Sequence, residues 1–430
     1  MRILETKSST FSKEFETILA RAQEDNEWVM PIVTKIIDEI KRDGDKALFE
    51  HIAKFDHWQP RTSDDLKIDQ NLMQKAYEAL DEKLRDALHL AYDRIKRYHE
   101  KQLPKSWVDF EKNGTILGQK VTPVEKAGLY IPGGKAAYPS SLLMNAIPAL
   151  VAGVDEIVVT TPTPHNEPNH LLLAACHLCG IEKVYKVGGA SAIAALAYGT
   201  ESIPKVDVIT GPGNIFVATA KRLVFGEVNI DMVAGPSEIG IIADSSANPR
   251  YVAIDLLSQA EHDEMASSIL ITDSSDLAQS VNDEVELFLE NLQRKEIAQK
   301  SIDERGAIIV ASSMDEAVEL MNTIAPEHLE IMTANPFDLL SKIKHAGAIF
   351  LGENTPEPIG DYIAGPNHTL PTGGTARFYS PLNVEHFMKK SSIINFSHQA
   401  MQEIGEAAAI LAHTEGLEAH AKSIEERLEK

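Results

Sequence analysis

The N-terminal quarter of the chain has hydrophobic positions at helical spacing. In residues 71–84, apolar side chains recur every three or four positions among charged ones, which is typical of an amphipathic helix. Runs with the pattern of a strand are few here. We therefore expect residues 1–105 to form a helical N-terminal region that carries no chemistry of its own.

The pattern changes after Pro123, where short β-branched runs alternate with longer apolar segments. The predicted strands of this part are residues 128–131, 156–160, 183–187, 206–210 and 228–233. About ten to twenty residues with helical spacing separate each strand from the next. A series of this kind predicts a parallel sheet with helices on both faces.

The same alternation returns in the second half, with predicted strands at residues 239–243, 268–272, 307–310 and 348–351. The sequence therefore predicts an α/β protein with two consecutive Rossmann-like α/β/α domains, over residues 106–236 and 237–380. In such sheets the loops at the carboxyl ends of the strands carry the ligands.

Residues 381–430 form a C-terminal tail in this prediction. We expect a last strand at residues 392–396 and a helical stretch over residues 400–430, where Ile404 and Leu411 mark an apolar face. Such a helix can dock on a partner subunit or on its own domain, and the sequence leaves both open.

The net charge excludes more classes of protein than the overall amino-acid composition does. The 430 residues include 41 Lys and Arg against 64 Asp and Glu, a formal net charge of −23, and no local basic patch is evident. Such a field repels nucleic acid and anionic membrane surfaces. Neither the N-terminus nor the apolar residues 142–154 suit export or a membrane span. We therefore expect a cytoplasmic enzyme or a small-molecule binder.

Two cysteines, Cys176 and Cys179, close an apolar helical run. A structural zinc site needs a second pair of ligands, and a redox pair is found at the start of a helix rather than its end. We expect both to be ordinary buried residues.

Three glycine-rich loops follow predicted strands, at residues 132–141, 187–191 and 211–214. Glycine between a strand and a helix lets backbone amides approach a phosphate, although such glycines also serve plain tight turns. The Rossmann fingerprint is incomplete, because Phe216 stands where its third glycine belongs. Asp231, 20 residues after Gly211, stays a candidate for a ribose contact.

Ionisable residues gather in four segments, residues 259–263, 325–329, 360–368 and 415–420, and the last three contain Gly or Pro. Gln259 and His262 are three apart near the end of a predicted helix, so both can bind one ion. The alternative is an ordinary polar helix end.

Glu327 and His328 follow Pro326, which suits the first position of a helix. In a first turn the helix dipole favours a carboxylate and keeps an imidazole neutral, able to act as a base. An ordinary acidic helix start is the other interpretation.

Taken together, these segments resemble the histidinol dehydrogenase family. The matching motifs, in order, are GLYIPGGKAAYPSSLLMNA from Gly128, AGPSE from Ala234, QAEHD from Gln259, APEHLE from Ala325, GDYIAGPNH from Gly360, LPTGGTAR from Leu370 and EGLEAH from Glu415. All of them in order form a specific signal, and the N-terminal region carries little of it.

The resemblance implies an aldehyde-dehydrogenase-like arrangement of the two α/β domains and a zinc-dependent, NAD-linked oxidation of L-histidinol via L-histidinal to L-histidine. It implies an interlocked homodimer whose tail completes the site of the neighbouring subunit. The implied zinc ligands, one ion per subunit, are Gln259, His262, Asp361 and, from the other subunit, His420.

By the same resemblance Glu327 and His328 form the catalytic pair. The implied substrate contacts are Ser237, Gln259, His262, Glu327, His328, Asp361, His368, Glu415 and His420. The implied NAD positions are Tyr130, Ser191 and Asn214. Ser191 departs from the glutamine usual in the family, which puts the affinity for NAD in doubt more than the chemistry.

Two rival functions remain open. A related zinc and NAD dehydrogenase oxidises a sulfonated diol, but Glu415 would place a negative charge near the sulfonate. A two-lobed α/β binding protein without catalysis would leave the Glu327–His328 pair without a purpose.

Overall fold

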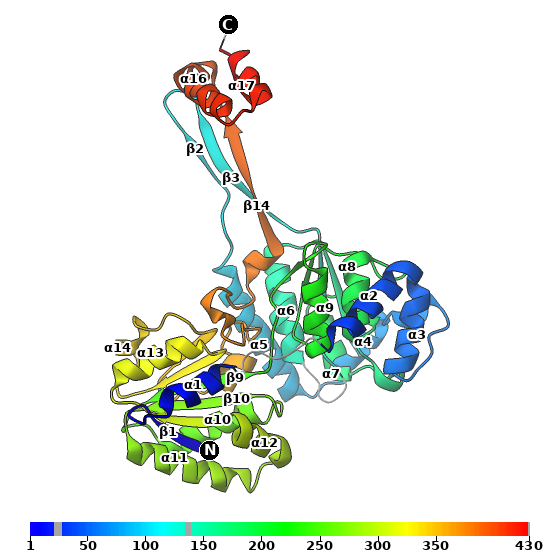
Figure 1. Ribbon diagram of the computed structural model, residues 1–430. Coiled ribbons are helices and arrows are strands. Elements are labelled where there is room, and N and C mark those ends of the chain that lie inside the picture. The colour runs from blue at the N-terminus through cyan, green and yellow to red at the C-terminus, as the bar shows by residue number, and fades with distance from the viewer. Residues whose placement is uncertain (21–27, 134–138, 429–430) are drawn as a thin grey trace. The chain divides into compact units, whose positions relative to one another are not determined.

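The computed structural model describes residues 1–20, 28–133 and 139–428 (Figure 1). Contacts divide the chain into two compact units. Unit 1 comprises Met1–Gln102 and Glu125–Phe387, and unit 2 comprises Leu103–Val124 and Met388–Lys430. Within the described ranges, no helix is long and apolar enough to cross a membrane.

The first sheet of unit 1 has five parallel strands in the order β6-β5-β4-β7-β8. Its strands are β4 (Lys126–Tyr130), β5 (Glu156–Thr161), β6 (Lys183–Lys186), β7 (Val208–Thr210) and β8 (Asn229–Ile230). The helices between them are α6 (Pro139–Ala152), α7 (His170–Leu178), α8 (Gly189–Tyr198) and α9 (Ile215–Val224). All five predicted strands of this part are confirmed.

The second sheet has six parallel strands in the order β1-β11-β10-β9-β12-β13. They are β1 (Arg2–Glu5), β9 (Glu238–Ala243), β10 (Ser267–Thr272), β11 (Ala307–Val310), β12 (His328–Met332) and β13 (Ala348–Leu351). Its helices are α10 (Pro249–Ala260), α11 (Ser275–Leu289), α12 (Lys295–Arg305), α13 (Met314–Ile324), α14 (Phe337–Leu340) and α15 (Glu357–Tyr362). The two predicted α/β sheets are thus both present.

The N-terminal region is helical after β1. Its helices are α1 (Phe11–Ala20), α2 (Met30–Asp43), α3 (Asp45–Phe55), α4 (Gln70–Glu78) and α5 (Glu82–Glu100). Figure 1 shows α2 beside α8 and α9, and Val33 and Leu48 share one buried core with Ile193. The one strand of the region before residue 105 that the structure describes, β1, pairs with β11, more than 300 residues away.

Unit 2 is an antiparallel sheet in the order β14-β3-β2, followed by two helices (Figure 1). Its elements are β2 (Trp107–Phe110), β3 (Ile116–Pro123), β14 (Met388–Asn395), α16 (His398–Thr414) and α17 (Glu418–Glu425). The predicted last strand overlaps β14. The predicted continuous helix is interrupted at Gly416, which has a positive φ of 76°. Phe110, Ile394 and Leu411 are largely exposed in this unit.

Contacts group the residues differently from the division we predicted at residues 105, 236 and 380. β1 belongs to the second sheet, and residues 103–124 belong with the tail because β3 pairs along its whole length with β14. The division into compact units does not test the predicted domain boundaries, which stay a prediction.

Candidate active site

The centre of the site is β12, whose alternation decides which side chains face it. Leu329 and Ile331 are buried in the core beneath one face of the sheet, so His328 and Glu330 point to the other face. Met332, on that other face, packs in the core formed with α10. The strand thus places a buried imidazole and a buried carboxylate against α10.

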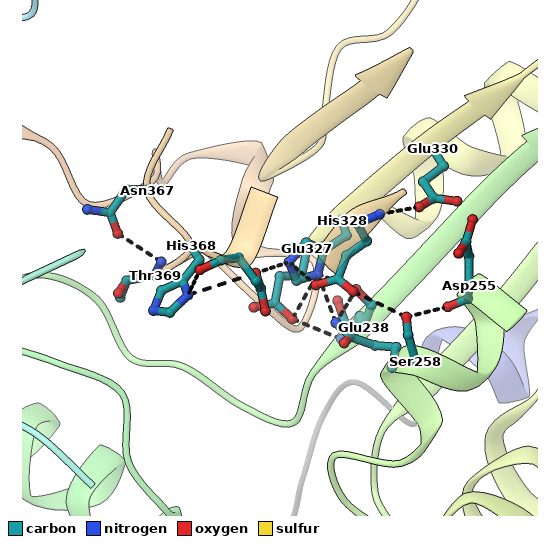
Figure 2. Close-up of polar contacts among 12 residues, drawn as sticks. Glu238, Asp255, Ser258, Glu327, His328, Glu330, Asn367, His368 and Thr369 are labelled. Carbon is teal, nitrogen blue, oxygen red and sulfur yellow. Dashed lines mark hydrogen bonds and ion pairs between the residues drawn. The ribbon is translucent and has the colours of Figure 1, made fainter. Parts of the chain in front are cut away.

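Glu327 immediately precedes β12 and lies beside His328, and Figure 2 shows both gathered with Glu238. The Glu327 carboxylate accepts a hydrogen bond from the backbone N–H of Glu238, 2.9 Å from nitrogen to oxygen. Its Oε2 is 3.6 Å from Nδ1 of His328. The expectation that both residues lie in the first turn of a helix is wrong, because the segment pairs with β9 and β13.

The last turns of α10 supply three polar side chains, Asp255, Ser258 and Gln259, at positions that share one helix face. The amide nitrogen of Gln259 lies 2.8 Å from Nδ1 of His328. The carbonyl oxygen of Glu238 is 3.1 Å from the same ring atom. The scaffold therefore engages Nδ1, which leaves Nε2 as the ring atom that opens into the site.

Glu357 and Asp361 approach this open ring atom from α15, where they are four residues apart on one face. Oε1 of Glu357 is 3.5 Å from Nε2 of His328, and Oδ1 of Asp361 is 3.7 Å from it. The Glu357 side chain is fixed because Ser258 donates a hydrogen bond to its Oε2, at 3.2 Å. Its backbone N–H donates to Glu330 at 2.7 Å.

Sequence reasoning missed Glu357, although Asp361 was singled out. A glutamate at the start of a short helix resembles many solvent-exposed helix starts. The available signal was the spacing of four residues between Glu357 and Asp361, which puts both carboxylates on one helix face.

Negative charge dominates the surroundings of His328. Burial would lower the pKa of His328, but Glu327, Asp361 and Glu357 outweigh it and raise the pKa. Burial also raises the pKa of Glu327 to about 8 and that of Glu357 to about 7. Three carboxylates around one imidazole can all be ionised at low cost only with a further positive charge nearby.

A second group of acids lies behind Glu357. Burial raises the pKa of Asp255 to about 7, and burial together with Asp255 raises that of Glu330 well above its usual value. Figure 2 shows Asp255, Ser258 and Glu330 to one side of His328.

Several buried polar atoms at this centre have no hydrogen-bond partner among the residues that the structure describes. They are Oε1 of Gln259, Nε2 of His328 and Oε1 of Glu357. His328, Glu357 and Asp361 offer one ligand atom each within 4.8 Å of one another. A mixed set of oxygen and nitrogen donors suits zinc, and unsatisfied buried acceptors fit a cation better than an empty space. The residues present therefore fit a bound zinc ion.

Three other predicted residues surround this centre. Nδ1 of His368 is 3.0 Å from the backbone carbonyl oxygen of Asp361. Part of the His262 ring meets solvent just beyond α10. Even so, desolvation lowers its pKa, and the charge of Asp361 opposes that shift. Ser237 directly precedes β9 and the Glu238 backbone that binds Glu327.

The predicted cofactor loops lie at the carboxyl ends of β4, β6 and β7, as expected for such a sheet. The hydroxyl of Tyr130, at the end of β4, accepts a hydrogen bond from the backbone N–H of Gly189 at 3.3 Å. Asn214 caps α9 through its side-chain oxygen. Residues 134–138 of the first loop fall outside the described residues. The predicted catalytic pair of the second sheet, in contrast, lies at the amino end of β12.

Ser191 and the cysteines are also accounted for. The Ser191 hydroxyl is buried and lies 2.9 Å from Nδ1 of His51, whose Nε2 contacts Glu39 at 2.9 Å. Cys176 and Cys179 are free and buried, as predicted.

Two predicted residues belong to unit 2. Glu415 caps the end of α16 and His420 lies in α17. Both side chains are exposed to solvent in unit 2.

Two parallel sheets covered by helices, together with a buried imidazole–carboxylate centre that suits a metal ion, define an α/β protein with a candidate metal site. At the level of the fold alone, the chain is similar to an acetylating aldehyde dehydrogenase from Geobacillus thermoglucosidasius, with a TM-score of 0.50 and 12% identity over 90% of this chain and 97% of that one. The sequence profile of the histidinol dehydrogenases matches residues 19–428.

Close relatives carry the same name. The histidinol dehydrogenase of Wolinella succinogenes is 69% identical over 99% of this chain and 98% of its own length. That of Sulfurimonas denitrificans is 68% identical over 99% of both. The crystal structure of the enzyme from Elizabethkingia anophelis superposes with a TM-score of 0.93, at 35% identity over 100% of this chain and 98% of that chain.

The chain therefore belongs to the histidinol dehydrogenase family, whose members are NAD-dependent, zinc-binding oxidoreductases of histidine biosynthesis. The resemblance noted in the sequence is confirmed. These relatives lend no support to the sulfonated-diol alternative.

Proposed function

We propose that Glu327 and His328 carry out the two-step oxidation of L-histidinol, via L-histidinal, to L-histidine in this chain. The observation that carries the proposal is the buried convergence of Glu327, Glu357 and Asp361 on one imidazole. A centre with that excess of negative charge suits a metal ion and a substrate with a cationic amine.

Zinc is held by Gln259, His262 and Asp361 in this proposal, and by His420 of a second copy of the chain. Two observations support this set: Oε1 of Gln259 has no hydrogen-bond partner among the described residues, and the charge of Asp361 acts on the pKa of His262. The group of His328, Glu357 and Asp361 is the alternative set.

When bound, zinc supplies positive charge that holds the substrate nitrogens, and NAD accepts the hydride. In the first oxidation Nε2 of His328 takes the hydroxyl proton while a hydride leaves the neighbouring carbon, which produces the aldehyde. Glu357, 3.5 Å from Nε2, stabilises the imidazolium that forms.

In the second oxidation Glu327 takes a proton from a water molecule while the oxygen of that water adds to the aldehyde carbon. The hydrate then loses a second hydride, and His328 takes its hydroxyl proton, which leaves the carboxylate. The balance is one alcohol, one water and two NAD giving one carboxylate, two NADH and three protons. Burial keeps the reactive aldehyde from side reactions between the two steps.

Ser237, His368 and Glu415 complete the substrate site in this proposal. Glu415 favours a cationic amine or imidazole over an anionic substrate. NAD lies along the glycine loops, at Tyr130, Ser191 and Asn214. Because the Ser191 hydroxyl is engaged with His51, residue 191 contributes through its backbone at the start of α8.

The enzyme works as a homodimer with shared active sites in this proposal. Glu415 and His420 are exposed in unit 2, as are large apolar side chains such as Phe110, Ile394 and Leu411, and such side chains suit an interface between copies. We also propose that the enzyme is cytoplasmic and binds no nucleic acid. A net charge of −23 repels nucleic acid and agrees with this.

Zinc content measured together with the NADH yield tests the proposal. We expect about one zinc per chain and two NADH per L-histidinol, because the reaction has two hydride steps. NADH formation from a sulfonated diol but not from histidinol would refute the substrate and leave only the family.

A further inference from the structure

A buried ion pair lies beneath the third glycine loop and has no part in the chemistry above. Lys221 of α9 and Asp231, just after β8, form it with side chains only 3% and 0% exposed. Charged side chains this deeply buried are rare unless each is paired and hydrogen-bonded.

Both members of the pair bind the backbone of the same loop residue, Gly211. Asp231 accepts a hydrogen bond from the backbone N–H of Gly211 at 2.9 Å. Lys221 donates to the carbonyl oxygen of the same glycine, also at 2.9 Å. Gly211 thus has its donor and its acceptor bound by one ion pair, whose second carboxylate oxygen meets Lys221 and the backbone N–H of Met232.

Gly211 links this pair to the other loops of the sheet edge. It has a φ of 121°, and a Cβ there would collide with the carbonyl oxygen of Tyr130, so only glycine fits. Tyr130 in turn accepts the hydrogen bond from Gly189 at the start of α8. Fixing Gly211 therefore fixes the point where the three loops meet.

We infer that the Lys221–Asp231 ion pair positions the loop of residues 211–214 so that Asn214 and its neighbouring amides are set to receive NAD. Both are positioning residues, and the inference rests on the proposed NAD site. The earlier candidate role of Asp231 as a ribose ligand is wrong, because both of its carboxylate oxygens are already bound within the protein.

The charged side chains of Lys221 and Asp231 are needed because they bind the N–H and C=O of Gly211. Two apolar side chains of similar volume can replace a buried ion pair with little loss of stability, or with a gain. Such a pair would, however, leave the N–H and C=O of Gly211 without partners. The ion pair is thus explained by the loop it holds rather than by the stability of the sheet.

The test separates stability from cofactor binding in the zinc-loaded full chain. The double variant Lys221→Met/Asp231→Leu keeps the buried volume while it releases Gly211. Leu173→Ala, a buried position on α7, is the matched control that lowers stability without touching the loop. NADH affinity is measured by fluorescence titration, and stability by thermal unfolding.

We expect the double variant to bind NADH about tenfold or more weakly than the wild type, since two positioned hydrogen bonds are lost. Leu173→Ala should bind NADH as the wild type does, even if it unfolds at a lower temperature. If the double variant does not fold, Asp231→Asn is titrated in its place, with the same expectation.

NADH affinity within twofold of the wild type in a folded double variant would overturn the inference and leave the proposed function intact. Asn214→Ala distinguishes the two failures. If that variant also binds NADH normally, the proposed cofactor loop is wrong, and the inference falls with it.

Discussion

Replacing Glu357 by glutamine tests whether this residue serves the imidazole or the metal ion. The change keeps the size of the side chain and its hydrogen bond from Ser258, but removes the charge that lies 3.5 Å from Nε2 of His328. If Glu357 stabilises the imidazolium, the variant should lose turnover and keep its zinc. If Glu357 is a metal ligand, it should lose zinc.

The size of the effect follows from the distance. A unit charge 3.5 Å away contributes about 5 kcal/mol at an effective dielectric constant of about 20. Burying the Glu357 carboxylate costs part of that energy, and Asp361 and Glu327 remain beside the ring. We therefore expect a net loss of about 2 kcal/mol, or about 30-fold in kcat.

The assay is NADH formation at saturating substrates, with the zinc content of the same preparation. His262→Asn is the reference for a lost ligand. It should lose about a quarter of a zinc-binding free energy of about 10–16 kcal/mol, which is roughly a 100- to 1000-fold loss of zinc affinity. Glu316→Gln is the matched control, since that carboxylate accepts hydrogen bonds from Thr6 and Ser312 away from the site. Zinc loss in Glu357→Gln as severe as in His262→Asn would refute the imidazolium role. A kcat within twofold of the wild type would refute any role in the reaction.

Three further predictions separate the remaining roles. Glu327→Gln should slow oxidation of the aldehyde at least about tenfold more than that of the alcohol in single-turnover NADH traces, because only the second step needs the water activated; equal slowing of both steps would contradict this role. Mixing a His420→Asn chain with a His328→Asn chain should restore up to about a quarter of the wild-type activity, because mixed dimers contain one site with both groups intact; no recovery would argue against a shared site. Ser191→Ala should lower the free energy of unfolding by about 1–3 kcal/mol, because His51 loses its partner, and should change the KM for NAD less than about threefold. A tenfold rise in that KM would show that the hydroxyl contacts NAD.

Much of the fold could be predicted because buried parallel strands are nearly continuous runs of β-branched residues. β9, β10 and β11 are of this kind and were predicted. β12 was missed because His328 and Glu330 interrupt its apolar pattern and Pro326 precedes it, which together resemble a helix start. Pairing with strands on both sides, a tertiary effect, decides its conformation.

Short strands with distant partners escaped for a different reason. β1 has four residues and pairs with β11, and β3 pairs with β14 at the far end of the chain. The local sequence pattern carries no information on such distant partners. The residues of β1 were therefore predicted to belong to a helical region, and those of β3 to the first α/β domain.

Among the acids around His328, Asp361 was singled out because it follows Gly360 in a segment rich in ionisable residues. Glu357 was missed although it stands between Pro356 and Pro358, because its position opposite His328 depends on the register of α15. The position of Glu327 and His328 depends on the strand pairing of β12. The general rule that ligands lie at carboxyl ends of strands fits the first sheet, but Glu327 and His328 lie at an amino end.

The buried charged groups around His328 and at Lys221–Asp231 differ in one decisive respect. At Lys221–Asp231 the opposite charges meet each other, and both ends of Gly211 take up their hydrogen bonds. Around His328 carboxylates outnumber the imidazole, and Nε2 of His328 and Oε1 of Glu357 lack hydrogen-bond partners within the described part of the chain. A buried polar group without a hydrogen-bond partner destabilises the fold, so such groups are rare where they serve only the scaffold. The complete cluster therefore belongs to the framework that shapes a loop, and the incomplete one belongs to the site where a metal ion and a substrate complete the charge balance.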